Sequence, residues 1–405
     1  MRAAGFLLYF CVMLHSRVEV GLERIAEKEF CSLFQGKKIG LITNHTAITG
    51  RFETIFDVFG SPKLGCQVTA VFAPEHGIDG LFYADHHVKD EKKQTFQIYS
   101  LYGKTRRPTG EMLDSVNLLV FDIQDIGCRS YTYATTLFYR MEAAQERKIP
   151  IVVLDRPNPL GGNLVDGFFV EEKLRAFNSY LNVPFCHGMT IGELARYFNA
   201  EYKVGAALTV IPMRGWNRSM TFVETGLPWV PTSPNVPERD TPFYYAATAA
   251  FGELSFVNIG VGYTLPFKVV GAPWIDSAQY RKVLQEQHLP GVTFAEIHFC
   301  PFFGLFKGEK CHGVQIHITD PAVFKPIETQ CFLFGILKSL YPDRVLEGLK
   351  KAGAQKIRLF SQAVGTEHMI ELIQTEKHVA WKLCKYQQGE REAFKERRRR
   401  YLIYL

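Results

Sequence analysis

The chain has 405 residues, of which 47% are hydrophobic and 22% charged, a composition typical of a folded globular protein with two or three domains. Its formal net charge is +6, and much of it lies in residues 391–400, where six basic side chains accompany two acidic ones. The rest of the chain is nearly neutral, which argues against a nucleic-acid-binding surface. We interpret the basic segment as the solvated end of a helix.

The first residues have the pattern of an export signal. Arg2 precedes an apolar run, Ala3–Leu14, which has the length of a signal-peptide core and is too short to span a bilayer. We therefore predict a signal peptide over residues 1–20, with a buried N-terminal helix as the alternative. No later segment reaches transmembrane length, so the mature chain is expected to lack an integral membrane segment and to be periplasmic or secreted.

Eight of the nine cysteines follow this segment. None of them forms a C-x-x-C pair, which disfavours a zinc knuckle or a thioredoxin-type motif. An even number in an exported protein permits disulfides without identifying which residues pair. The eight are Cys31, Cys66, Cys128, Cys186, Cys300, Cys311, Cys331 and Cys384.

Apolar strands alternate with helices in the first half of the chain. This alternation predicts an α/β fold with a parallel, doubly wound sheet. The strands are expected at Lys38–Thr43, Val68–Phe72, Asn117–Phe121 and Ile149–Leu154. Helices are expected at Phe52–Phe59 and Tyr133–Glu146.

Polar residues follow each of these four strands. In the second, Pro74 stops the strand and Gly77 and Gly80 allow a sharp loop. The carboxyl ends of parallel strands meet at one edge of a sheet, where ligands bind in open α/β folds. We therefore predict a single crevice lined by Asn44, Glu75, His76, Asp122, Asp125, Asp155, Arg156 and Asn158.

Nucleotide and metal sites are both disfavoured. The first strand is followed by residues 44–50 without a G-x-G-x-x-G pattern, and the chain has no Walker sequence, so no nucleotide cofactor is expected. Asp85, His86 and His87 lie near Glu75 in the sequence, but three adjacent side chains cannot all point at one ion from a regular element. With no H-E-x-x-H motif either, we predict no metal and no other cofactor.

The second half of the chain differs from the first. Thr190 and Glu193 form a capping box at a helix start, and His187 just before it either reaches a ligand or closes the turn. A proline-dense stretch, residues 226–237, is the candidate domain junction. Beyond it we expect an accessory α+β domain with a strand at Gly313–Ile318 and helices at Ile327–Leu340 and from Glu390. The predicted division is a signal peptide at 1–20, a catalytic domain at 22–232 and an accessory domain at 233–405.

Several strings in this order resemble the NamZ-type exo-β-N-acetylmuramidases, a glycoside hydrolase family that acts on peptidoglycan fragments. The resemblance runs from about Lys38 to the C-terminus. It implies a Rossmann-like parallel-sheet N-terminal domain, a smaller α+β C-terminal domain and an active cleft between them. The strings are Gly40–Asn44, Pro74–Gly77, Tyr99–Gly103, Phe121–Gly127, Asp155–Gly162, His187–Leu194 and Ser233–Asn235.

The resemblance also implies that Glu75, in the P-E-H-G string, is the catalytic acid. Glycoside hydrolysis requires such an acid beside the leaving oxygen, and His76 could orient it. Arg129 and Arg156 are candidates to hold the lactyl carboxylate of muramic acid, or else each pairs with a neighbouring aspartate. The remaining candidates for a second carboxylate or for binding the substrate are Asn44, Asp122, Asp125, Asp155, Asn158, His187 and Asn235.

Three positions depart from the family pattern. Asp79 stands where P-E-H-G-x-R-G has arginine, Val261 stands where a G-R-G-T turn has arginine, and Lys268 replaces the glutamate that usually follows P-F. We expect a hydrolase that releases N-acetylmuramic acid from the non-reducing ends of peptidoglycan fragments during cell-wall turnover and recycling. The alternative is a catalytically weakened protein of the same fold that binds muramyl sugars.

Overall fold

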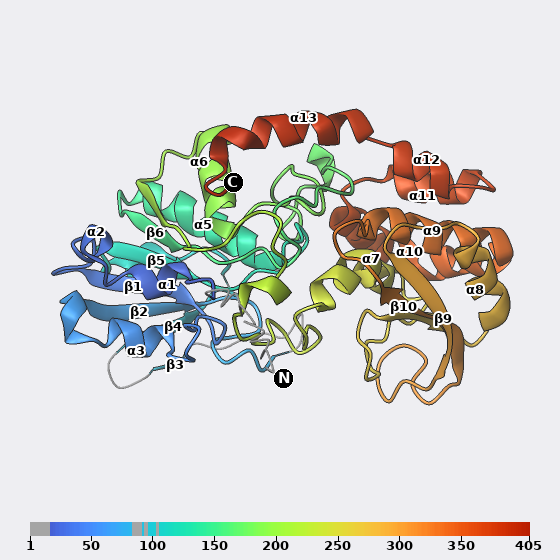
Figure 1. Ribbon diagram of the computed structural model, residues 1–405, viewed down its shortest axis with the longest axis horizontal. Helices are drawn as coiled ribbons and strands as arrows, with labels where there is room; N and C mark the ends of the chain where they lie inside the picture. The colour runs from blue at the N-terminus through green and yellow to red at the C-terminus, as the bar shows by residue number, and fades with distance from the viewer. Residues whose placement is uncertain (1–16, 83–90, 93–95, 103–104) are drawn as a thin grey trace, which may run out of the picture.

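The computed structural model describes residues 17–82, 91–92, 96–102 and 105–405. Two domains lie along the long axis of the molecule, with α7 (Thr241–Leu254) at the junction (Figure 1). Most of the predicted signal peptide and the Asp85, His86 and His87 cluster lie outside the described residues.

The N-terminal domain is built on a seven-stranded sheet in the order β3-β4-β2-β1-β5-β6-β7. Six strands are parallel, and only the edge strand β3 is antiparallel to its neighbour. This confirms the predicted α/β fold. The strands are β1 (Lys38–Thr43), β2 (Gln67–Ala73), β3 (Glu91–Lys92), β4 (Gln97–Ser100), β5 (Leu118–Asp122), β6 (Ile151–Leu154) and β7 (Leu208–Ile211).

Helices cover both faces of this sheet, which is why its strands are apolar along their whole length. In β5, Leu119 and Phe121 join the core that includes α5 and α6, whereas Leu118 and Val120 join a second core on the opposite face. The helices of this domain are α1 (Gly21–Arg24), α2 (Lys28–Cys31), α3 (Ile55–Phe59), α4 (Gly110–Leu113), α5 (Thr132–Glu146) and α6 (Ile191–Glu201).

The second domain combines a small antiparallel sheet with a layer of helices, as predicted. Its strands are ordered β8-β10-β9, with bounds β8 (Val269–Ala272), β9 (Val292–Phe299) and β10 (Cys311–Ile318). The helices that follow α7 are α8 (Ser277–Gln285), α9 (Pro326–Leu340), α10 (Pro342–Val364), α11 (His368–Thr375), α12 (Ala380–Lys385) and α13 (Gln388–Arg398). Short 3-10 turns lie at Pro62–Leu64, Glu172–Leu174, Val223–Thr225 and Arg399–Tyr401.

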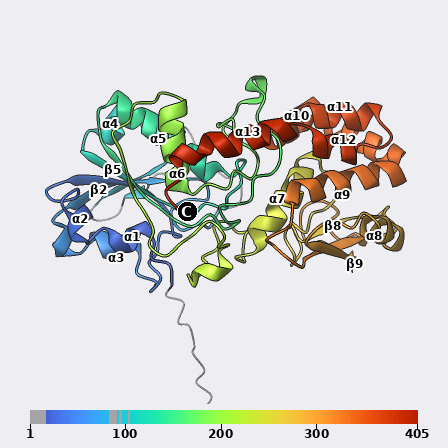
Figure 2. The same ribbon diagram turned by 45° about the horizontal axis from the view of Figure 1, so that its top comes forward.

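The last residues return from the second domain to the first. Helix α13 crosses from α12 to α6, as Figures 1 and 2 show, and Phe394 packs edge-on against Phe169 and Tyr197 at 6.0 and 5.8 Å. Tyr404 then donates a 2.6 Å hydrogen bond to Asp155. The predicted accessory domain, 233–405, therefore ends in a segment, residues 388–405, that completes the N-terminal domain.

The basic segment is only partly the solvated helix end that was expected. Arg398 is buried and donates hydrogen bonds to the carbonyl oxygens of His187 (2.8 Å) and Gly162 (3.1 Å). Its neighbours Arg399 and Arg400 are exposed and pair with Glu396 and Glu201. The prediction of a solvated end was wrong for Arg398, because sequence alone did not show that loop carbonyls lie above this turn.

Residues 17–20 belong to the folded N-terminal domain. Val18 and Val20 are buried, and the Glu19 N–H donates to the Arg214 carbonyl oxygen at 3.0 Å. A leader that ended at residue 20 would remove these contacts. Within the described residues, no helix has both the length and the apolarity needed to cross a membrane.

Candidate functional site

A cavity of about 360 Å³ lies where the two domains meet. Glu75, His76 and Asn235 are the predicted site residues that line it. The N-terminal domain also contributes Ser130, Tyr131 and Thr132, and the second domain contributes Tyr245 and Glu253 of α7, Phe267, and Gln362 of α10. Aromatic rings and polar groups converge on a space of the size that holds a small organic ligand.

Glu75 lies directly after the buried strand β2 and is only 7% exposed. Its Oε2 accepts a 2.6 Å hydrogen bond from the Thr132 hydroxyl, at the first residue of α5. The carboxylate is therefore fixed on one side by another element of the sheet edge, while its residue faces the cavity.

His76 has a positive φ of 70°, which turns the chain sharply after Glu75. Its Nδ1 lies 2.6 Å from the Phe82 carbonyl oxygen and must carry the proton to make that hydrogen bond. In the neutral ring, Nε2 is then an acceptor. Gly77, also at positive φ, closes the turn with an N–H bond to the Pro74 carbonyl oxygen.

A network of tyrosines supports this corner of the cavity. The Tyr131 hydroxyl donates to Thr232 Oγ1 at 2.9 Å, and the Tyr133 hydroxyl donates to the Thr232 carbonyl oxygen at 2.6 Å. Burial raises the pKa of both tyrosines, so they stay neutral donors. Asn44 donates to the Tyr133 hydroxyl at 3.1 Å and is itself buried, so it supports the cavity from below rather than lining it.

Arg106 gives the described part of the lining a guanidinium group, and sequence reasoning did not select it. Its guanidinium stacks over Phe177 at 4.2 Å and Tyr102 at 5.4 Å from the ring centroids. Arg106 is exposed, so its guanidinium can meet a ligand from the solvent side.

Most of the other polar residues at the strand ends lie beneath the cavity and not in it. Asp122 and Arg156 form a buried ion pair with an Nη2–Oδ2 distance of 3.0 Å. Asp155 accepts from Thr190 at 2.8 Å and from the Gly192 N–H at 2.8 Å, which anchors the start of α6. The strands do bring these residues to one edge, but their polar groups satisfy one another and the loop backbone.

Asn158, Arg129 and His187 are likewise engaged inside the protein. Asn158 donates to the Met189 carbonyl oxygen at 3.0 Å. Arg129 is buried and donates to backbone carbonyl oxygens of both domains, including Val183 (2.8 Å) and Val364 (2.8 Å). Its guanidinium therefore ties the domains together and does not face a ligand.

His187 closes a turn, which was one of the two predicted readings. Its Nδ1 accepts the Met189 N–H at 3.2 Å. Burial, together with the nearby guanidinium groups of Arg398 and Arg129, lowers the pKa of His187 to about 3, so the ring stays neutral.

Asp125 is a further buried carboxyl below the site. Its Oδ2 accepts the Gly127 N–H at 2.8 Å, while its Oδ1 has no hydrogen-bond partner within the described residues. Burial raises the pKa of Asp125 to about 7.

The three departures from the family pattern lie in different surroundings. Asp79 is exposed and is not part of the cavity lining. Lys268 pairs with Glu238 and, at 3.2 Å, with Asp240, so two carboxylates balance its charge. Val261 is half-buried in the turn that precedes Phe267.

Comparisons with known proteins match the chain along both domains. Family models described as "Exo-beta-N-acetylmuramidase NamZ, N-terminal" and "Exo-beta-N-acetylmuramidase NamZ, C-terminal" match residues 39–240 and 243–404. The peptidoglycan beta-N-acetylmuramidase NamZ of Bacillus subtilis (strain 168) is 42% identical over 330 residues, which cover 81% of this chain and 79% of the relative.

Two solved structures, both of DUF1343 family proteins from Bacteroides fragilis NCTC 9343, share the fold. One has a TM-score of 0.89 at 36% identity, and the other a TM-score of 0.71 at 26% identity. Each alignment covers 96% of this chain and 99% of the solved chain. The likeness therefore includes the junction between the domains where the cavity lies.

Proposed function

Because the chain belongs to the NamZ family of exo-β-N-acetylmuramidases, which are glycoside hydrolases, we propose that it hydrolyses the glycosidic bond of non-reducing terminal N-acetylmuramic acid in peptidoglycan fragments. One observation carries the assignment of the catalytic acid: Glu75 faces the cavity between the domains while Thr132 holds its carboxylate. Protonation of the glycosidic oxygen by Glu75 would let the bond break through an oxocarbenium-like transition state.

The lining suits a sugar that carries a carboxylate. Rings of Tyr102, Tyr131, Phe177 and Tyr245 offer apolar faces to a pyranose, and hydroxyl groups nearby can bond to its oxygens. The stacked Arg106 guanidinium is our candidate for the lactyl carboxylate that distinguishes muramic acid from glucosamine. This role replaces the one predicted for Arg129 and Arg156, whose guanidinium groups are used inside the protein.

Glu253 is our candidate for a second carboxylate. It lies on α7 of the second domain and lines the same cavity as Glu75 of the first domain. Carboxyl groups on two sides of a scissile bond are the usual arrangement for glycoside hydrolysis. Their location on different domains would make the relative position of the domains part of the catalytic geometry.

The test is a chromogenic β-glycoside of N-acetylmuramic acid, assayed with the wild type, Glu75→Gln and Asp79→Asn. We expect Glu75→Gln to lower kcat by about 100-fold to 10,000-fold, because a general acid contributes that range. Asp79→Asn is the matched control, since this nearby carboxylate is exposed and outside the cavity lining, and its kcat should equal that of the wild type.

If the wild type released product no faster than Glu75→Gln, the proposed reaction would be wrong. Retained binding of N-acetylmuramic acid without turnover would instead support the muramyl-sugar-binding alternative. Equal rates on muramic-acid and glucosamine glycosides would overturn the substrate assignment alone.

We further propose that the chain is exported and acts in cell-wall turnover and recycling. The apolar run after Arg2 supports export, and the folded position of residues 17–20 supports a leader that ends before Arg17. Fractionation of cells that express the full chain, with N-terminal sequencing of the product, tests this. A chain that stays in the cytoplasm with Met1 or Arg2 at its start would contradict it.

A further inference from the structure

Cys128 and Cys186 lie opposite each other on two antiparallel segments beside the proposed active site. They form an antiparallel bridge, and the Arg129 N–H donates to the Phe185 carbonyl oxygen at 2.8 Å. This hydrogen bond identifies the two cysteines as a non-hydrogen-bonded pair, in which the Cα atoms of a regular ladder are about 4.5 Å apart and the side chains are closest. Disulfides span Cα distances of about 4.4–6.8 Å.

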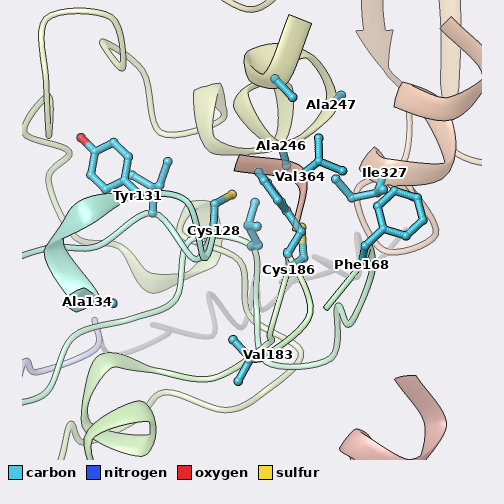
Figure 3. Close-up of a cluster of buried hydrophobic side chains, with 14 of the residues drawn as sticks. Cys128, Tyr131, Ala134, Phe168, Val183, Cys186, Ala246, Ala247, Ile327 and Val364 are labelled. Atoms are coloured by element: carbon cyan, nitrogen blue, oxygen red, sulfur yellow. The ribbon is translucent and has the colours of Figure 1, made fainter. Parts of the chain in front are cut away.

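Both side chains are fully buried, and Figure 3 shows them in one apolar cluster together with Val183 and Phe168. Burial, and after it the neighbouring Cys128 thiol, raises the pKa of Cys186 well above its usual value. In the folded chain these thiols are therefore closed to solvent and unreactive as nucleophiles. A bond between them must form while the chain folds, and it would afterwards be protected from reductants.

Cys331 and Cys384 meet in a different way, across two packed helices. A Cβ atom at Gly335 of α9 would lie 3.0 Å from the Cβ of Ala380 in α12, so the two helices touch there. The rings of Phe332 and Trp381 meet edge-on at 5.0 Å on the same seam. Cys331 is four residues before Gly335 and Cys384 is four residues after Ala380, which places them one turn along the seam of two antiparallel helices.

This second pair is open to small molecules. Cys331 and Cys384 both line a cavity of about 700 Å³ between α9, α12, α13 and the loop at 160–168. Cys331 is buried, whereas Cys384 is half-buried. A small thiol that enters the cavity could therefore reach this sulfur pair.

We propose that Cys128–Cys186 and Cys331–Cys384 form two disulfides in an oxidising environment, the first closed to reductants and the second reducible through the cavity. The inference does not depend on the proposed hydrolase activity. The Cys31 thiol donates to the Lys63 carbonyl oxygen at 3.8 Å, and the exposed Cys300 thiol donates to that of Pro301 at 4.0 Å. Cys300 serves as the control at an exposed position.

The oxidant is a second disulfide, either glutathione disulfide or an oxidised dithiol oxidoreductase. One cysteine thiolate attacks a sulfur of that disulfide, which forms a mixed disulfide and releases one thiolate. The second cysteine then attacks its partner's sulfur, which forms the protein disulfide and releases the other thiolate. Two electrons pass to the oxidant, and the two protons lost by the cysteines are available to its two thiolates.

The consequence for the site is mechanical. Cys128 begins the segment that carries Ser130, Tyr131 and Thr132 into the cavity. A bond to Cys186 would fix this segment to the loop before His187. The Cys331–Cys384 bond would fix α12, and with it the start of α13, to the second domain.

The first test uses the full chain refolded in a buffer of reduced and oxidised glutathione, digested without reductant and analysed by mass spectrometry. We expect peptides that link Cys128 to Cys186 and Cys331 to Cys384. Unlinked peptides for these four residues, or links to other cysteines, would overturn the pairing. This measurement needs no variant, so it holds even where a substitution prevents folding.

The second test treats the folded, oxidised chain with dithiothreitol and then with an alkylating reagent. Cys331 and Cys384 should be labelled first, and Cys128 and Cys186 only after a denaturant is added. Labelling of all four at one rate would refute the difference in access.

The third test compares melting temperatures under oxidising conditions. The double variants Cys128→Ala/Cys186→Ala and Cys331→Ala/Cys384→Ala should each melt about 5–10 °C below the wild type. Cys300→Ala should melt with the wild type. A wild-type melting temperature that does not change when the protein is fully reduced would contradict the proposal.

Discussion

At the scale of single residues, the orientation of Glu75 depends on one hydroxyl group. Thr132 stands at the start of α5, and its Oγ1 donates to Glu75 Oε2 at 2.6 Å. Thr132 is thus a positioning residue for the proposed acid. Its own position is set by the segment that follows Cys128.

We expect Thr132→Val to lower kcat by about 10-fold to 100-fold, because a hydrogen bond to an ionisable partner contributes about 1.5–3 kcal/mol. The kinetics of the muramic-acid glycoside measure this. Thr132→Ser keeps the hydroxyl and should recover most of the rate at an unchanged melting temperature. Equal losses in Thr132→Val and Thr132→Ser would mean that packing, not the hydroxyl, supports catalysis.

Arg106 should determine which sugar binds. Arg106→Ala is expected to raise KM for the muramic-acid glycoside by about tenfold or more, since a charge-assisted hydrogen bond is lost, and to leave KM for the glucosamine glycoside unchanged. Arg107→Ala is the control, because the Arg107 guanidinium pairs with Glu142 and lies outside the cavity lining. A similar rise in KM for both glycosides would show that Arg106 does not bind the lactyl carboxylate.

Asp125 should make stability depend on pH. Its pKa is about 7 in the folded chain and 3.8 ordinarily, so between these values the folded state holds a proton that the unfolded state has lost. The free energy of unfolding therefore falls as pH rises from about 4 to 7. Asn cannot ionise. The free energy of unfolding of Asp125→Asn should therefore rise by up to about 4 kcal/mol relative to that of the wild type between pH 4 and pH 8.

Urea unfolding of both proteins across this pH range measures the gain. Asp79→Asn is again the control, because it removes a carboxylate from an exposed position. A constant difference between Asp125→Asn and the wild type across this range would show that Asp125 is ionised throughout.

Sequence reasoning identified the edge of the sheet that carries the site but not all the side chains that line it. Glu75, His76 and Asn235 do line the cavity, whereas Asp122, Asp155 and Arg156 are buried below it. Polarity after a strand shows that a residue lies at the carboxyl edge, and it does not show whether the side chain meets ligand or backbone. Tyr245 and Glu253 were missed because they come from a distant helix that tertiary packing alone brings to the site.

At the scale of elements, most predicted helices were found within a few residues. The helix predicted at Tyr133–Glu146 is α5 (Thr132–Glu146), and Thr190 and Glu193 form the capping box that was expected before α6. The helix predicted at Phe52–Phe59 begins only at Ile55, because Thr54 caps it. Local signals were sufficient here because caps and apolar periodicity act within a few residues.

The segment 388–405 had no such local signal. Its attachment to the N-terminal domain depends on contacts with residues about 200 positions earlier in the chain, such as Tyr401 with Glu201. Tyr404 bonds to two buried groups, because its hydroxyl donates to Asp155 and accepts the Met213 N–H at 2.8 Å.

We expect Tyr404→Phe to lower the free energy of unfolding by about 1–3 kcal/mol, because it leaves the buried Asp155 and Met213 groups without this partner. Tyr401→Phe is the matched control, because the Tyr401 hydroxyl bonds to Glu201, which also pairs with Arg400. This change should lower the free energy of unfolding by less than Tyr404→Phe does. Chemical denaturation of the three proteins gives the comparison. A larger effect of Tyr401→Phe would contradict the role assigned to Tyr404.

At the scale of the whole molecule, several connections among the described residues hold the two domains together. The chain passes from one to the other before α7, Arg129 reaches the carbonyl oxygens of α10 residues, and α13 crosses back. The proposed site lies between domains that are tied at more than one place. Such ties limit how far the two walls of the cavity can separate, which favours a preorganised site over one assembled by a large domain motion.

The bond between Tyr404 and Asp155 also bears on how the protein is made. Tyr404 follows Asp155 by 249 positions, so it leaves the ribosome after every strand of the first domain. Domains generally fold as they emerge during synthesis, with the N-terminal one first. Here the first domain stays incomplete until Tyr404 has emerged, so its final packing follows the synthesis of the whole second domain.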